Sequence, residues 1–184
     1  MAMPMAPRYT VADLADLPED GRRHELIRGA LVVSPAPSVH HQIIVGRIAD
    51  ALATYLAPQG LRNTLFAVAA DISWDNENLV QPDLLVARPE ELSHRWSSVR
   101  RLRLAVEVLS PASRRRDRLD KRTLYQEHAV ETYWAVDLEA RLVERWRPED
   151  ERPELIADRL DWRILPDAPV MGLELARLFA DLPA

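Results

Sequence analysis

The chain has 184 residues, 47% of them hydrophobic, which is enough to bury the core of one domain of ordinary size. It contains no cysteine, so disulfides and thiolate zinc sites are excluded. The net charge of −5 argues against a protein that coats nucleic acid through bulk charge, and no early apolar run has the length of a signal peptide or membrane span. We therefore expect a cytoplasmic protein with no membrane contact and a single domain over residues 1–184.

The first third of the chain predicts a short helix, a hairpin and a long helix. A threonine suited to an N-cap opens the segment 10–17, which a proline and a glycine close. Residues 24–27 and 30–33 flank an Arg-Gly pair typical of a two-residue hairpin turn, and Glu25 lies in the first strand. The apolar residues of segment 44–56 recur four positions apart, which predicts a helix that packs on a sheet.

The middle of the chain predicts three strands. Residues 65–74 are apolar and favour β-structure, and residues 79–87 are expected to return antiparallel to them after a turn. Pro82 lacks an amide proton, which places it at a strand start or edge. In the strand over residues 102–109, large apolar side chains alternate towards one face, so Glu107 points to the other face.

A helix and a further strand follow Glu107. The helix begins at Ser110 or at Ser113, since either residue can act as its N-cap, and runs to about His128. The next strand covers residues 132–136, so strand, helix and strand predict a right-handed crossover and a mixed sheet. The remaining predicted elements are strands at residues 142–146, 154–157 and 162–165 and a C-terminal helix at residues 173–182.

Two carboxylates stand on predicted strands that are otherwise apolar and that we expect to be neighbours in the sheet. Burying Asp83 or Glu107 is costly unless the charge is paired or binds a cation. Pairing with some of the chain's 23 arginines is one explanation. A magnesium site is the other, because Mg²⁺ prefers oxygen ligands and usually takes only one or two protein carboxylates, with water and substrate phosphate completing its coordination.

Lys121 is the only lysine among 24 basic residues. Genome composition is the ordinary reason for such a bias towards arginine. On the predicted helix Asp117, Lys121 and Tyr125 share one face, so an ion pair with Asp117 is available as a structural explanation. A compact ammonium is also suited to approach a water molecule and a phosphate oxygen, which makes Lys121 a candidate catalytic residue.

Short motifs from these elements occur in a fixed order along the chain. They are Glu25-Leu26-Ile27, Ser34-Pro35-Ala36-Pro37-Ser38 with His41-Gln42, Gln81-Pro82-Asp83, Glu107-Val108-Leu109-Ser110-Pro111, Arg116-Asp117 with Lys121 and Tyr125, and Tyr133-Trp134 with Val136-Asp137. Together they resemble the Uma-two endonuclease family of the PD-(D/E)xK nuclease superfamily, over about residues 8–182. The resemblance implies an α/β, restriction-endonuclease-like core, with a mixed central β-sheet flanked by helices and an N-terminal hairpin.

The resemblance also implies roles for individual residues. Asp83 and Glu107 would hold Mg²⁺ or Mn²⁺, and the backbone carbonyl of Val108 would join them. The superfamily pattern has a lysine two residues after the second acid, where this chain has Leu109. In the Uma-two pattern a lysine on the next helix takes its place, which corresponds to Lys121.

Other residues have two explanations each. Glu25 either completes an acidic cluster at the metal or is an exposed strand residue. His41, near a helix start, is a candidate for contact with phosphate or metal. Arg115 and Arg118 belong to a basic run at residues 114–122, which either tracks a phosphate backbone and binds DNA or forms a solvated helix face.

These observations predict a magnesium-dependent DNA endonuclease that hydrolyses phosphodiester bonds, with Asp83, Glu107, Lys121 and Glu25 as its site. One alternative is a nuclease-fold domain that binds nucleic acid or a protein partner without catalysis. Another is a purely structural dimeric module. DNA is the expected partner of the enzyme, and a homodimer is left open.

Overall fold

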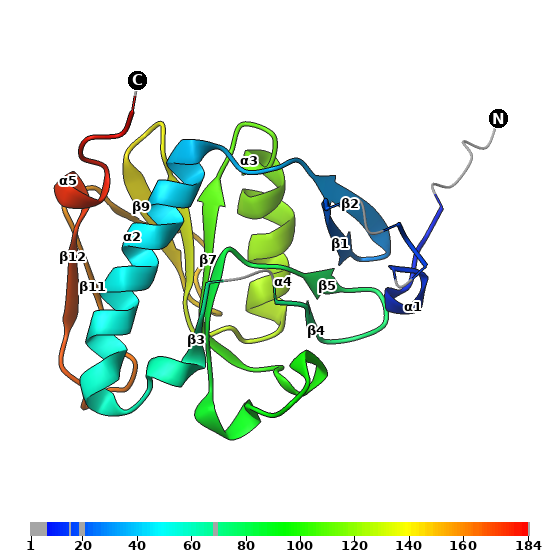
Figure 1. Ribbon diagram of the computed structural model, residues 1–184, viewed down its shortest axis with the longest axis horizontal. Coiled ribbons are helices and arrows are strands. Elements are labelled where there is room, and N and C mark those ends of the chain that lie inside the picture. The colour runs from blue at the N-terminus through cyan, green and yellow to red at the C-terminus, as the bar shows by residue number, and fades with distance from the viewer. Residues whose placement is uncertain (1–6, 15, 19–20, 68–69, 184) are drawn as a thin grey trace.

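The computed structural model describes residues 7–14, 16–18, 21–67 and 70–183. Within them, a six-stranded sheet forms the centre of an α/β fold and carries helices on both faces (Figure 1). The strands are β1 (Arg23–Ile27), β2 (Ala30–Ser34), β3 (Leu65–Phe66), β4 (Ile72–Ser73), β5 (Leu79–Val80), β6 (Leu84–Ala87), β7 (Leu102–Leu109), β8 (Tyr133–Asp137), β9 (Leu142–Trp146), β10 (Glu154–Ile156), β11 (Arg159–Trp162) and β12 (Met171–Glu174). The helices are α1 (Val11–Leu14), α2 (Val39–Leu56), α3 (Arg114–Arg116), α4 (Arg122–Glu127) and α5 (Leu175–Leu178).

The central sheet is mixed, as expected. Its strands run in the order β10-β9-β8-β7-β6-β3, and β7 and β8 are parallel while the other neighbours are antiparallel. Helix α2 covers one face and packs Ile44, Ile48 and Leu52 against residues such as Val106 and Trp134. Helix α4 covers the opposite face, so the sheet is buried on both sides, which explains the nearly continuous apolar character of β7 and β8.

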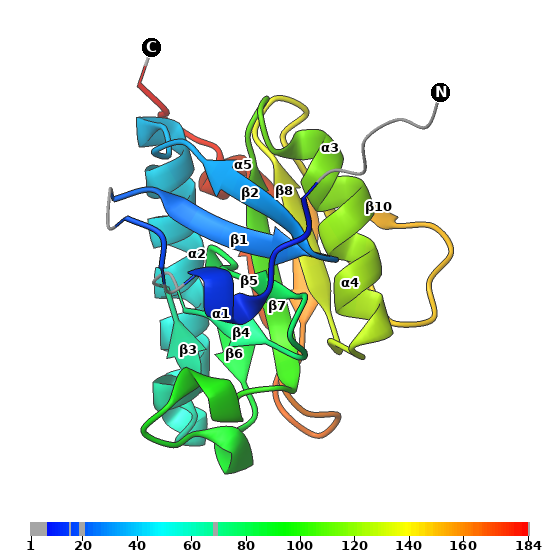
Figure 2. The ribbon, with the colours of Figure 1, turned by 90° about the vertical axis from the view of Figure 1, so that its right-hand side faces the viewer.

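A second, four-stranded sheet has the order β2-β1-β5-β4 and lies on the α4 side of the molecule (Figure 2). The predicted hairpin forms half of it, and both turn residues have positive φ, 52° at Arg28 and 77° at Gly29. That geometry matches the twist of the flanking strands and needs glycine at its second position. The hairpin joins the rest of this sheet through the pairing of Leu26 with Leu79.

The two strands predicted at residues 65–74 and 79–87 are each divided between the two sheets. Strands β3 and β6 pair antiparallel in the central sheet, whereas β4 and β5 pair antiparallel in the smaller one. The antiparallel return was therefore predicted correctly, but continuous strands were wrong; residues 68–69 of the first segment lie outside the described residues. The chain changes sheet at residues 81–83, where Pro82 has no amide to continue a ladder.

The predicted helix after β7 consists of α3, a π-helical turn at Asp117–Lys121, and α4. Ser113 is the residue at its N-cap, so the later of the two expected starts is observed. A π-turn inserts an extra residue into a helix and is frequent at functional sites. The turn here carries both Asp117 and Lys121, which are buried.

The ends of the chain differ most from expectation. The N-terminal helix is described only as α1, shorter than the predicted segment 10–17, of which residue 15 lies outside the described residues. The predicted C-terminal helix at 173–182 begins instead with β12, which pairs with β11 and leaves only α5 helical. Within the described ranges no helix has the length and apolar character that crossing a bilayer requires.

Candidate active site

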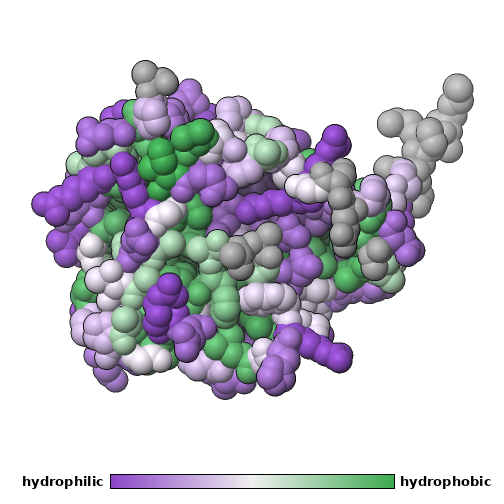
Figure 3. Space-filling view, in the orientation of Figure 1, coloured by the Kyte–Doolittle hydropathy of each residue, from purple (hydrophilic) through white to green (hydrophobic). Residues whose placement is uncertain are grey.

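A pocket of about 590 Å³ opens between the linker from β2 to α2 and the loop from β7 to α3. Residues 34–38 form one wall and residues 110–113 the other. Hydrophilic side chains gather on the face between α2 and the β1–β2 hairpin (Figure 3), whereas these walls are partly apolar because they contain prolines and alanines. Among the described residues, four buried carboxylates line the pocket, Glu25, Asp83, Glu107 and Asp117, and the exposed Glu139 lines it as well.

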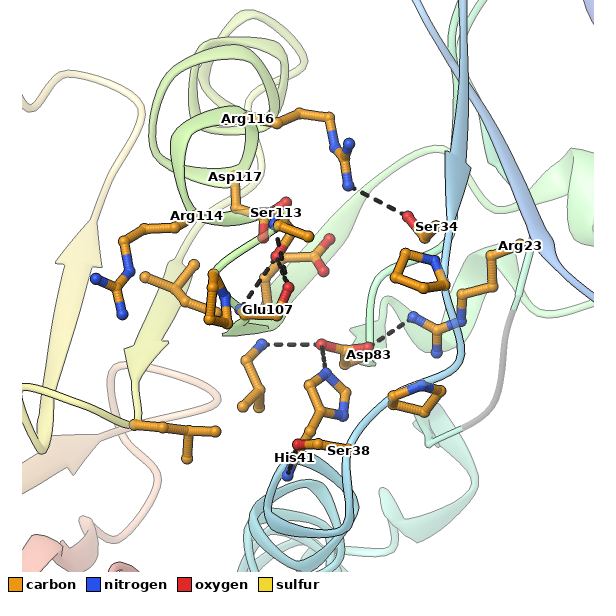
Figure 4. A pocket seen from close by; sticks show the side chains of 18 of the residues that line it. Arg23, Ser34, Ser38, His41, Asp83, Glu107, Ser113, Arg114, Arg116 and Asp117 are labelled. Atoms are coloured by element: carbon orange, nitrogen blue, oxygen red, sulfur yellow. Dashed lines mark hydrogen bonds and ion pairs between the residues drawn. The ribbon is translucent and has the colours of Figure 1, made fainter.

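Asp83 directly precedes β6 and is held by three partners (Figure 4). Its Oδ2 accepts a hydrogen bond from the Val108 amide at 2.8 Å and lies 2.9 Å from His41 Nε2, while its Oδ1 accepts from Arg23 at 2.7 Å. Burial by itself would raise the pKa of this carboxyl, but the bonds from His41 and Val108 and the charge of Arg23 hold the pKa below its usual value. Asp83 is therefore ionised and fixed in orientation.

Glu107 lies on β7 beside Asp83, because the pairing of Leu84 with Val106 brings these two residues to the next position along adjacent strands. Its Oε1 accepts hydrogen bonds from Lys121 Nζ and from the Tyr125 hydroxyl, both at 2.8 Å. Burial raises the pKa of Glu107 well above its usual value; the Lys121 charge opposes this shift, and the neighbouring carboxylates add to it.

Lys121 is buried, with only 3% of its surface exposed. Its ammonium lies 2.7 Å from Glu25 Oε1, 2.8 Å from Glu107 Oε1 and 3.9 Å from Asp117 Oδ1. Burial disfavours the charged amine, but Glu107 and the other carboxylates raise its pKa, so it stays protonated. An exposed helix ion pair with Asp117 therefore does not explain Lys121. The lysine is buried, and its closer partners are Glu25 on β1 and Glu107 on β7.

Glu25 is 2% exposed, so its reading as an exposed strand residue is wrong. Besides contacting Lys121, its Oε1 accepts a hydrogen bond from the backbone amide of Gln81 at 2.8 Å. Strand β1 therefore brings Glu25 from the smaller sheet into the cluster formed by residues of the central sheet and the helix.

Asp117 also belongs to the cluster, although the sequence analysis gave this residue no role at the site. It is 2% exposed, and among the described residues its Oδ1 has no hydrogen-bond partner. Burial raises the pKa of this carboxyl although the Lys121 charge lowers it. The face that Asp117 shares with Lys121 and Tyr125 was the available signal, since a carboxylate beside a buried lysine on one helix face is buried with it.

The cluster contains more acid than base. Among the described residues, two side chains with a permanent positive charge lie within ion-pair distance of its four carboxylates, Arg23 and Lys121. Across the described residues, no three acidic or histidine side chains are arranged as a ready metal site. Asp83 and Glu107 nevertheless offer the donor chemistry that Mg²⁺ and Mn²⁺ prefer, and the excess negative charge favours a divalent cation.

The arginines proposed to bind DNA lie outside this pocket. Arg115 is exposed, and Arg118 is paired with Asp137 at 2.7 Å and Glu144 at 2.6 Å. Neither is among the residues that line the pocket, so their contact with DNA stays a prediction. His41, in contrast, lines the pocket, and its observed partner there is the Asp83 carboxylate. Its contact with phosphate or metal stays a prediction.

The mixed sheet with helices on both faces is the α/β architecture that was expected, and a solved nuclease structure shares this fold. The family model Uma2, described as "Putative restriction endonuclease", matches residues 11–177, and the chain belongs to this family. A crystal structure at 1.96 Å, described as "a putative nuclease belonging to DUF820 from Anabaena variabilis ATCC 29413", has a TM-score of 0.73 and 21% identity over 93% of this chain and 97% of that chain. That likeness supports the fold. No match was found among the curated proteins.

Proposed function

We propose that the protein is a DNA endonuclease that depends on Mg²⁺ or Mn²⁺. The observation that carries the proposal is the excess of buried carboxylate around one buried lysine at the base of a pocket. Isolated buried charges are costly, so a fold keeps an unbalanced cluster only where a ligand or a reaction uses it. Membership in a family of putative restriction endonucleases supports the choice of phosphodiester hydrolysis.

Asp83 and Glu107 would hold the metal, joined by the Val108 carbonyl. When bound, a divalent cation polarises the scissile phosphate and lowers the pKa of a water molecule. His41 and Arg23 fix the Asp83 carboxylate by direct contacts, and Tyr125 does the same for Glu107. These contacts keep both acids in one orientation before substrate arrives, so little reorganisation is needed.

Besides the metal ion, the Lys121 side chain supplies positive charge at the site. Its ammonium is held between Glu25 and Glu107, and it lines the pocket. From that place it is suited to orient a water molecule or to stabilise the negative charge that develops on phosphate oxygens in the transition state. Glu25 acts by positioning Lys121, since it contacts the ammonium at 2.7 Å.

Incubation of supercoiled plasmid with the purified protein, over a series of Mg²⁺ and Mn²⁺ concentrations, tests the proposal. We expect nicked and linear products that disappear when a chelator is added or when Asp83 is changed to Asn. The matched control is Asp137→Asn, which neutralises another buried aspartate that does not line the pocket and should still cut. Cleavage that survives the chelator would contradict the metal dependence. DNA binding with no cleavage under any condition would favour the non-catalytic alternative.

A further inference from the structure

Of the described residues, three arginines line the pocket, and two of them form ion pairs with carboxylates of the protein. Arg23 donates to Asp83 at 2.7 Å. Arg114 donates to Glu139 at 2.6 Å and lies 3.6 Å from Asp137. The charge of each guanidinium is therefore balanced by direct contact, and neither is available for a ligand without breaking an ion pair.

Arg116 differs from the other two. Its guanidinium reaches from α3 across the pocket and donates to the Ser34 hydroxyl at 3.2 Å (Figure 4). In the part of the chain that the structure describes, carboxylates lie within ion-pair distance of Arg23 and Arg114 but not of Arg116. The Nε of Arg116 is buried without a hydrogen-bond partner, as is that of Arg114, so the missing carboxylate is what sets Arg116 apart. Its charge acts on Asp117 only at longer range. A buried donor without an acceptor is unfavourable, so an acceptor that reaches the Arg116 Nε–H would be bound favourably.

We propose that Arg116 anchors a phosphate group of the bound nucleic-acid strand at the mouth of this pocket. A guanidinium presents two parallel donors that match two phosphate oxygens, and such charged bonds are stronger than a bond to a neutral hydroxyl. Phosphate therefore replaces the Ser34 hydroxyl as the partner of Arg116 and satisfies its free Nε. The proposal rests on the proposed function, because it assumes that the pocket receives a nucleic-acid strand.

The position of Arg116 suits this role. It is followed directly by Asp117 and, one helical turn later, by Lys121, both of which face the carboxylate cluster. A phosphate held by Arg116 brings the strand to the open side of that cluster. The negative charge of the acids repels nucleic acid, so a cation from the protein that is not already neutralised is needed at the entrance.

Equilibrium binding of a fluorescein-labelled thymidine tetranucleotide tests the inference. Calcium, which also takes oxygen ligands, replaces magnesium, and electrophoresis checks that the probe stays intact. We expect Arg116→Ala to weaken binding by at least about tenfold, the loss of one charge-assisted bidentate contact. Arg115→Ala is the matched control, since it removes the same charge from the exposed neighbour that does not line the pocket, and it should change binding by less than about twofold.

Ser34→Ala separates phosphate binding from a structural bridge. This change removes the hydroxyl but keeps the guanidinium, so the variant should bind the tetranucleotide at least as tightly as the wild type. Equal weakening by Ser34→Ala and Arg116→Ala would assign Arg116 to holding the linker and overturn the inference. Absence of binding by the wild type, or equal losses in Arg115→Ala and Arg116→Ala, would overturn it as well.

The inference and the proposed function fail in different ways. A wild type that binds the tetranucleotide but cuts no plasmid with Mg²⁺ or Mn²⁺ contradicts the nuclease and leaves the Arg116 comparison readable. A wild type that cuts plasmid while Arg116→Ala binds normally contradicts only the phosphate anchor. Thermal unfolding of each variant, expected within a few degrees of the wild type, verifies that the fold is kept.

Discussion

The helical segment from α3 to α4 has two charged sides, and they differ in how their acids are balanced. On one side, Asp117 and Lys121 join the carboxylate cluster of the pocket. On the other, Arg118 pairs with the buried acids Asp137 and Glu144. Burial raises the pKa of Glu107 and Asp117 in the first group, whereas hydrogen bonds and Arg118 hold the pKa of Asp137 below its usual value despite burial.

The comparison separates charges that stabilise the fold from charges that do not. In the second group each buried acid faces a half-exposed guanidinium, so ionisation of Asp137 is favoured in the folded state. In the first group the folded state favours protonation of Glu107, so its ionised form opposes folding. A residue kept at a cost to stability points to use by a ligand or a reaction.

The largest expected effect is on the rate of cleavage. Lys121→Arg keeps a positive charge between Glu25 and Glu107, but a planar guanidinium cannot take the place of a compact ammonium. We expect the single-turnover cleavage rate to fall by at least about a hundredfold, as for the loss of one contact that stabilises the transition state. Arg122→Lys, a basic exchange on the same helix at a residue that stacks on Trp146, is the control and should cut normally. Wild-type rates in Lys121→Arg would reduce Lys121 to an ion-pairing residue.

Divalent cations should stabilise the wild type, because they relieve the repulsion within the acidic cluster. At a Mg²⁺ or Mn²⁺ concentration one hundred times the Kd, linkage predicts a gain of about 2.7 kcal/mol in the free energy of unfolding. Asp83→Asn should lose this gain, whereas Asp137→Asn should keep it. Calorimetry that detects no divalent binding to the wild type at millimolar concentrations would refute the metal site.

Neutralising one acid from each group should change the free energy of unfolding by unequal amounts in metal-free buffer at neutral pH. Asp137→Asn deprives the Glu139 and Ala140 amides and Arg118 of a charged acceptor, and we expect a loss of about 1–3 kcal/mol in unfolding free energy. Glu107→Gln keeps an oxygen that can accept from Lys121 and Tyr125, and Glu25 remains beside the ammonium, so this variant should lose less. Urea denaturation measures both, and a larger loss in Glu107→Gln would contradict the comparison.

The same pair of variants should diverge with pH. The pKa of Asp137 is lowered in the folded state. The stabilisation that its ionised carboxylate gives the folded state is therefore complete above the ordinary pKa of 3.8 and is lost as pH falls through the folded-state pKa. The pKa of Glu107 is raised, so the cost of its charge disappears as pH falls through the folded value towards the ordinary 4.5. The difference in unfolding free energy between the wild type and Asp137→Asn should therefore shrink in acid. Over the same pH range, the unfolding free energy of the wild type should rise relative to that of Glu107→Gln.

The smallest expected effect concerns the exposed basic surface. If Arg115 contacts the backbone of long duplex DNA, Arg115→Ala should lower the slope of log affinity against log salt by about 1. Arg118 is less suitable for this test, because replacing it also breaks its ion pairs with Asp137 and Glu144. An unchanged slope would assign Arg115 to a solvated helix face.

Elements with strong local signals were predicted well from the sequence. The hairpin around Arg28 and Gly29, the apolar repeat of α2 and the alternation in β7 each depend on neighbours a few positions apart. The pairing of Asp83 and Glu107 followed from expecting their strands to be adjacent. The division of residues 65–87 between two sheets could not be read in this way, because sheet membership is set by distant partners.

The site shows the same limit. Sharing a helix face placed Asp117, Lys121 and Tyr125 together, but whether that face was buried depended on β1 and β7 packing over it. The extra residue of the π-turn has no local sequence signal. Within the basic run, the sequence favoured Arg115 and Arg118, whereas the pocket receives Arg114 and Arg116, since a shift of one residue on a helix turns a side chain by about 100°.

The attachment of the hairpin has a kinetic consequence. Glu25 reaches Lys121 only after β1 docks, and that docking joins segments far apart in sequence, as does the pair of Arg28 with Glu127, 99 positions apart. Because closing such long loops is entropically costly, we expect these contacts to form late in folding. Desolvation of the acids would then wait until the rest of the core exists, and a molecule with an undocked hairpin would be nearly folded yet have a hydrated, incomplete site.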